Sequence, residues 1–116
     1  MSICIYHNPR CSKSRETLKL LQERGIEPEI REYLKDVPSA DELKSVLAAL
    51  GISARDLLRS KETEYKEAGL DDQSLSEDAI IKAMTEYPKL IERPIVINGD
   101  KARIGRPPES VLEILA

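Results

Sequence analysis

A chain of 116 residues, 41% of them hydrophobic and 34% charged, fits a single globular domain. The net charge of −3 and an aromatic content limited to four tyrosines argue against a nucleic-acid-binding surface. The apolar runs are too short to span a membrane, and no leader pattern precedes the first apolar stretch. We therefore expect a cytoplasmic protein.

The first third of the chain is predicted to form a β-α-β unit. Residues 3–6 are continuously apolar, as in a strand covered on both faces. A helix is predicted to begin at Cys11 or Ser12 and to run to Gly25, a residue type common just after a helix. Residues 29–34 mix charged and apolar side chains and are predicted to form an edge strand.

A helical block is predicted to follow, over about residues 39–87. Serine marks the N-cap of three of its helices, and Ser39 forms a capping box with Glu42. The predicted helices cover residues 40–50, 54–59, 62–68 and 76–87. Gly51 and Pro88 are typical of the ends of the first and last of them.

The last part of the chain is predicted to form a β-hairpin and a helix. Residues 95–97 are predicted to form a second buried strand and residues 102–104 its return strand, on either side of Asn98-Gly99-Asp100, a strong hairpin-turn signal. Arg106-Pro107-Pro108 is predicted to open the C-terminal helix.

The order of elements predicts an α/β fold, a thioredoxin-like mixed sheet with a helical insertion at about 39–87, in one domain over residues 1–116. In such a fold, Arg93-Pro94 before the buried strand 95–97 would be the characteristic cis-proline.

Cys11 is the candidate nucleophile because of its place at the start of a helix. The unpaired N–H groups and the positive dipole end of a helix N-terminus favour an anion. Arg10, Lys13 and Arg15 add positive charge nearby, so we expect a lowered thiol pKa. The backbone amides of the same loop could also hold an oxyanion substrate.

The other cysteine and the single histidine have less defined roles. Cys4 lies within the first apolar strand, where we expect a small buried hydrophobe and no disulfide with Cys11. His7 and the two cysteines lack the spacing of a zinc site, so no metal is expected. Ser14 either bonds the Cys11 thiolate or satisfies a backbone N–H, and His7 either tunes the thiolate when protonated or makes a local hydrogen bond.

Four motifs, in this order along nearly the whole chain, resemble the arsenate reductase (ArsC) family of the glutaredoxin-linked type. The motifs are Tyr6-His7-Asn8-Pro9 leading to Cys11 and Ser14-Arg15, then Leu57-Leu58-Arg59, Glu92-Arg93-Pro94-Ile95-Val96 and Arg106-Pro107. Arg10 before the cysteine and Ser12-Lys13 after it differ from the plasmid-borne resistance enzymes and resemble a chromosomal branch.

The resemblance implies reduction of arsenate to arsenite through a covalent adduct on Cys11, with glutathione as co-substrate, glutaredoxin as partner and no bound cofactor. Arg59, Arg93 and Arg106 match the three arginines that bind the oxyanion in that family, and His7 and Ser14 match positions around the thiolate. Because position 14 is serine and Cys4 lies in a strand, the second thiol is expected to come from outside the chain.

Two alternatives stay open. One is a glutathione-dependent thiol reductase or transferase that acts on another substrate. The other is an Spx-like transcription regulator, a class that binds RNA polymerase and usually carries a Cys-x-x-Cys switch. Here Cys11-Ser12-Lys13-Ser14 offers only one thiol.

Overall fold

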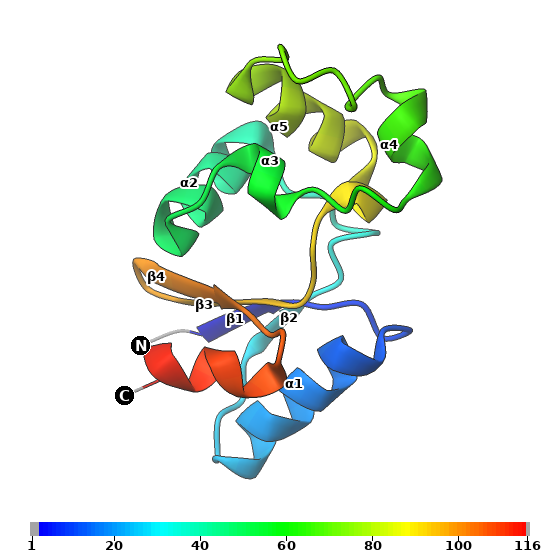
Figure 1. The fold of residues 1–116 in the computed structure, drawn as a ribbon. Coiled ribbons are helices and arrows are strands. Elements are labelled where there is room, and N and C mark those ends of the chain that lie inside the picture. The colour runs from blue at the N-terminus through cyan, green and yellow to red at the C-terminus, as the bar shows by residue number, and fades with distance from the viewer. Residues whose placement is uncertain (1–2, 116) are drawn as a thin grey trace. The chain divides into compact units, whose positions relative to one another are not determined.

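The computed structural model describes residues 3–115, which form two compact units. The sheet unit comprises residues 3–36 and 93–115, and the helical unit comprises residues 37–92 (Figure 1). The helical unit includes the segment 39–87 that the sequence predicts as an insertion. That the chain acts as a single domain stays a prediction.

The sheet unit contains a four-stranded mixed sheet in the order β2-β1-β3-β4. Its strands are β1 (Ile3–Tyr6), β2 (Glu29–Arg31), β3 (Ile95–Asn98) and β4 (Lys101–Ile104). β1 runs parallel to β2 and antiparallel to β3, and β3 pairs antiparallel with β4 across the two-residue turn Gly99-Asp100. The predicted thioredoxin-like mixed sheet is confirmed.

Two helices cover one face of this sheet: α1 (Ser12–Glu23) and the C-terminal 3-10 helix η2 (Pro108–Ile114) (Figure 1). The core between them and the sheet is apolar and consists of Ile5, Leu21, Val96, Val111 and Ile114. Burial of these side chains is the main force that holds α1 against the sheet.

Two predictions in this unit need correction. Cys4 is only partly buried, because neighbouring strand residues point to opposite faces and Ile5 is the one directed at the core. β2 ends at Arg31, three residues before the predicted end. The Glu32 carbonyl accepts from the N–H groups of Lys35 and Asp36, so the chain turns there.

The helical unit contains α2 (Ala40–Leu50), α3 (Ala54–Leu57), α4 (Thr63–Glu67), α5 (Glu77–Glu86) and the 3-10 helix η1 (Pro88–Leu90). Its buried side chains are all apolar, and they include Leu43, Leu57, Ile80, Met84 and Leu90. Each predicted helix is present, and the Ser39–Glu42 capping box is confirmed.

α4 and α5 are each one residue shorter at both ends than predicted, and α3 stops two residues before its predicted end. α3 ends at Leu57, two residues before Arg59, because Leu58 leaves the helix to form an isolated β-bridge with Ile91. Two backbone hydrogen bonds flank this bridge: Arg59 N–H donates to the Leu90 carbonyl, and Glu92 N–H donates to the Leu57 carbonyl.

Across residues 3–115, none of the helices combines the length and apolar character that a membrane span requires. The Arg93–Pro94 peptide bond is cis, as a thioredoxin-like fold implies, and the Arg106–Pro107 bond is also cis.

Candidate functional site

Cys11 is the N-cap residue of α1. The loop before it turns because the Cys11 N–H donates to the Asn8 carbonyl at 3.0 Å, and the Cys11 carbonyl accepts the first helical bond, from Arg15. The side chain is 8% exposed. The first turn of α1 carries no acidic residue. The helix N-terminus thus keeps its positive end for an anion.

The surroundings of Cys11 favour its thiolate. Burial raises the pKa of the thiol. Hydrogen bonds from the Ser14 backbone N–H and the Arg93 guanidinium lower it, and so do the charge of Arg93 and, to a smaller extent, the Lys13 N–H. Together these contributions outweigh the effect of burial. The pKa of Cys11 therefore lies below its ordinary value. A lowered pKa gives more of the nucleophilic form at neutral pH.

Arg106 also contacts the sulfur. Its Nη2 donates to Cys11 Sγ at 3.6 Å, and its Nε donates to the Arg93 carbonyl at 2.8 Å. The sheet unit thus brings together three residues that lie up to 95 positions apart in the chain: Cys11, Arg93 and Arg106. Two guanidinium groups beside a thiolate form a site suited to an oxyanion, because each guanidinium can donate paired, charge-assisted hydrogen bonds.

The cations that the sequence placed near Cys11 act differently from the prediction. The Arg15 guanidinium donates to the Pro9 carbonyl at 3.0 Å, and the Lys13 ammonium pairs with Glu16 at 3.7 Å. Lys13 lowers the Cys11 pKa through its backbone N–H, and the guanidinium that lowers it belongs to Arg93. The main cationic partner thus comes from a distant segment of the chain.

His7 and Ser14 form a buried pair beside the loop. Ser14 Oγ lies 2.6 Å from His7 Nδ1 and accepts the Asn8 N–H at 3.0 Å. The Ser14 hydroxyl therefore holds the loop, as in the second of the two interpretations above, while the Ser14 backbone N–H serves Cys11.

The protonation of His7 follows from its burial. Burial lowers the pKa of His7, Glu32 raises it and Arg15 lowers it, and the net result is a pKa below the ordinary value. The imidazole is therefore mostly neutral at pH 7. Of the two roles considered for His7, a neutral ring fits the local hydrogen bond with Ser14 and not the role of a positive charge that tunes the thiolate.

Arg59, the third predicted arginine, belongs to the helical unit. Its guanidinium lies 3.6 Å from the Glu62 carboxylate and 3.7 Å from that of Glu92. Its predicted contact with an oxyanion at Cys11 stays a prediction.

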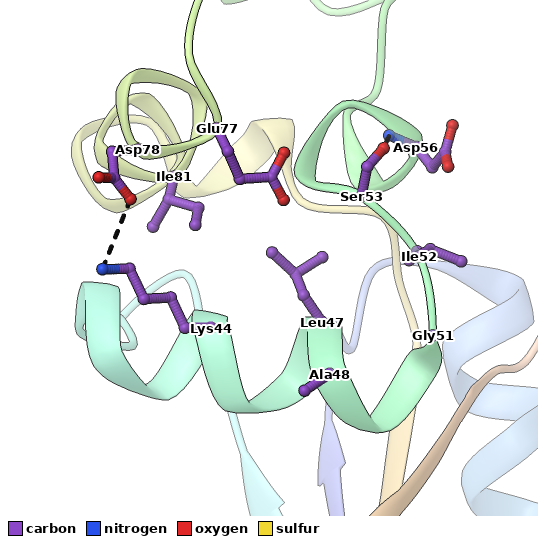
Figure 2. Close-up of a pocket in the computed structure, with 10 residues that line it drawn as sticks. All are labelled: Lys44, Leu47, Ala48, Gly51, Ile52, Ser53, Asp56, Glu77, Asp78 and Ile81. Carbon is purple, nitrogen blue, oxygen red and sulfur yellow. Dashed lines mark hydrogen bonds and ion pairs between the residues drawn. The ribbon is translucent and has the colours of Figure 1, made fainter.

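The two units also contain cavities that do not include Cys11, Arg93 or Arg106. One of about 540 Å³ in the helical unit contains none of the predicted site residues, and its polar rim is already engaged: Glu77 accepts the Ala54 N–H, and Lys44 pairs with Asp78 (Figure 2). A smaller one of about 200 Å³ adjoins the loop before Cys11 and is lined in part by His7, Arg10 and Glu32.

The structure adds Asn8 to the predicted site. Its Oδ1 accepts the Arg10 N–H at 3.0 Å, and its own N–H reaches Ser14. An asparagine before Pro9 is a turn signal that could have indicated this role. Within residues 3–115 there is no group of His, Cys, Asp and Glu side chains placed to hold a metal ion.

Comparisons with known proteins identify the family of the chain. The model of the ArsC family matches residues 6–114. The chain is 62% identical to the "Uncharacterized protein YfgD" of Escherichia coli (96% of this chain, 94% of that one) and 57% identical to the "Arsenate reductase" of Haemophilus influenzae (99% and 100%). The structure is similar to that of "Arsenate reductase from Vibrio cholerae", with a TM-score of 0.96 and 57% identity over 99% of this chain and 98% of that one. The chain belongs to the ArsC family.

Proposed function

We propose that this protein reduces arsenate to arsenite through a covalent adduct on Cys11, with glutathione as co-substrate and glutaredoxin as partner. The observation that carries the proposal is the low-pKa thiol of Cys11 held beside the guanidinium groups of Arg93 and Arg106. Relatives named arsenate reductases at 49–57% identity support arsenate as the oxyanion.

In the first step, the Cys11 thiolate attacks arsenic and an arsenic–oxygen bond breaks, so that one oxygen leaves as water after protonation. Arg93 and Arg106 bind the remaining arsenate oxygens and offset their negative charge, which would otherwise repel the thiolate. The product is a sulfur–arsenic(V) adduct on Cys11.

In the second step, the glutathione thiol supplies the other sulfur. Arsenic accepts two electrons and leaves as arsenite, and the two sulfurs become a disulfide between Cys11 and glutathione. Glutaredoxin then reduces this disulfide by thiol exchange and regenerates the Cys11 thiolate. An external thiol is needed because Cys4, the other cysteine, lies in β1 and is predicted to have no part in the reaction.

The test measures arsenite formation with glutathione, glutaredoxin and a glutathione-recycling system, against a Cys11→Ser control. We expect sustained turnover only when all components are present. Glutathione without glutaredoxin should give the adduct and little turnover, and thioredoxin alone should serve poorly.

Two results would contradict the proposal. Turnover with thioredoxin as sole reductant would make Cys4 a resolving thiol. No arsenate turnover under any thiol system, with Cys11 still reactive, would favour a thiol transferase with another substrate, or an Spx-like regulator if the protein then binds RNA polymerase.

A further inference from the structure

The two site arginines lie opposite each other because the β3–β4 hairpin continues beyond its strands. The last strand pair is Ile95 with Ile104. One position further, the Gly105 N–H donates to the Pro94 carbonyl at 2.9 Å. One position further again, Arg106 Nε donates to the Arg93 carbonyl at 2.8 Å. The extension therefore places both arginines at one point, next to Cys11.

Gly105 is the position at which this extension packs tightly on α1. A Cβ atom on Gly105 would lie 2.5 Å from Thr17 Oγ1, 2.8 Å from Pro94 Cγ and 3.1 Å from Thr17 Cγ2. Thr17 is fully buried, and its hydroxyl donates to the Lys13 carbonyl at 2.8 Å, so it cannot yield easily. Thr17 and Pro94 therefore occupy the space that a side chain at position 105 would need.

This glycine differs from the other four in the chain. Gly25, Gly51, Gly69 and Gly99 have φ between 64° and 76°, and a Cβ on any of them would meet nothing within 4 Å. The φ of Gly105 lies outside that left-handed region. Glycine is therefore needed at 105 for close approach and at the other four for backbone conformation.

We propose that Gly105 is a positioning residue. Because it lacks a side chain, the hairpin extension can lie against Thr17 of α1. This close packing brings Arg93 and Arg106 to the Cys11 sulfur at the N-terminus of the same helix. This inference deepens the proposed function, since it rests on Cys11 and the two arginines as the reacting site. Any side chain at 105 must push the extension off α1 by about 1 Å to reach ordinary contact distances. The Arg106–Cys11 contact at 3.6 Å would then exceed hydrogen-bonding range.

The test is the pH dependence of Cys11 alkylation by iodoacetamide, with the site of modification identified by mass spectrometry. This readout needs no arsenate, so it separates failure of the positioning role from failure of the proposed function. In Gly105→Ala we expect the alkylation profile to move to higher pH, with about threefold to tenfold slower reaction at pH 7. In the arsenate assay, KM should rise more than kcat falls.

Rescue distinguishes positioning from general damage. Thr17→Ala removes two of the three close contacts, so Thr17→Ala/Gly105→Ala should recover part of the lost rate, and Thr17→Ala alone should react like the wild type. Gly99→Ala lies in the same hairpin, at its far turn, and should lower the melting temperature through its φ of 64° without changing Cys11.

A folded Gly105→Ala whose Cys11 reacts at the wild-type rate across the pH range would overturn the proposal. So would a loss that Thr17→Ala does not relieve, or an equal loss in Gly99→Ala. If Gly105→Ala alone does not fold, the double variant decides, because it must fold and its Cys11 must react within about threefold of Thr17→Ala.

Discussion

The helices of the two units begin in different ways. α2, α3 and α5 in the helical unit each begin at a serine whose Oγ accepts a backbone N–H of the first turn, and each has acidic residues in that turn. α1 in the sheet unit begins at Cys11, with no acidic residue in its first turn. These three N-termini of the helical unit serve stability, whereas the N-terminus of α1 in the sheet unit is left to a thiolate.

The interiors of the two units also differ, in the number of polar side chains that they bury. Among the described residues, the buried polar side chains are His7, Ser14, Thr17 and Asn98, and all four belong to the sheet unit. Burying a polar group costs stability unless it is hydrogen-bonded, and each of the four has a hydrogen-bond partner: His7 with Ser14, Thr17 with the Lys13 carbonyl, and Asn98 with the Ile114 carbonyl. Three of them lie in the loop or helix that carries Cys11, so polar burial is concentrated where the chemistry is proposed.

Cys11→Ser tests this contrast most severely. We expect arsenate turnover to fall by roughly a thousandfold or more, because the nucleophile is lost, while the fold persists, since serine is itself a good N-cap. Cys4→Ala should keep near wild-type turnover. Initial rates of arsenite formation and circular dichroism check both variants, and loss of activity in folded Cys4→Ala would contradict the assignment of Cys11 as the sole essential thiol.

Loss of one site arginine should have the next largest effect. Arg93→Ala and Arg106→Ala are each expected to weaken arsenate or sulfate binding by about tenfold to a hundredfold, since a hydrogen bond to a charged group contributes about 1.5–3 kcal/mol. Lysine at either position should recover only part of the affinity, because it lacks the planar fork.

Arg59→Ala asks whether the helical unit contributes to the same site. If the predicted contact exists, arsenate binding should weaken to a similar degree as in Arg106→Ala. Unchanged affinity, measured by isothermal titration calorimetry, would confine the oxyanion site to the sheet unit.

Ser14→Ala should mainly affect stability. It removes the acceptor of the Asn8 N–H and the partner of His7, both beside the loop, and we expect a loss of about 1–3 kcal/mol in the free energy of unfolding. Urea denaturation measures this loss. Wild-type stability would mean that the Ser14–His7–Asn8 bonds do not hold the loop.

Ser39→Ala is the matched change in the helical unit. Removing its capping box should lower the free energy of unfolding by about 1 kcal/mol and leave the alkylation rate of Cys11 unchanged. An altered Cys11 rate would show that the two units are not independent in this respect.

The smallest effect expected is a dependence of stability on pH. The pKa of Cys11 is lower in the folded than in the unfolded chain, so the unfolded state binds more protons between these two values. Stability from this group is therefore complete above the unfolded pKa and is lost as pH falls through the folded pKa. As pH rises across that window, the melting temperature of the wild type should increase relative to that of Cys11→Ser. A difference in melting temperature that does not change with pH would contradict a lowered Cys11 pKa in the folded chain.

Much of the fold could be predicted from local patterns. The Ser39–Glu42 box, the serines before α3 and α5 and the hairpin signal Asn98-Gly99-Asp100 each act between residues a few positions apart, and the caps and the hairpin are present in the structure. The place of Cys11 at a helix start is local information of the same kind. Two ends were predicted too far along the chain. α3 ends early because Leu58 forms a β-bridge with Ile91, and β2 ends early because the chain turns at Glu32.

The sequence by itself thus determined the elements, the cysteine at the helix start and, through its motifs, the set of candidate arginines. Only the tertiary structure decided that Arg93 and Arg106, not Arg10 or Arg15, contact the Cys11 sulfur, and that the Ser14 hydroxyl serves the loop while its N–H serves the thiolate. The need for glycine at 105 was also hidden, because it arises from Thr17 in a helix 88 positions away. Caps and turns depend on short-range backbone bonds that a linear pattern records, whereas these contacts depend on how the hairpin and α1 pack on each other.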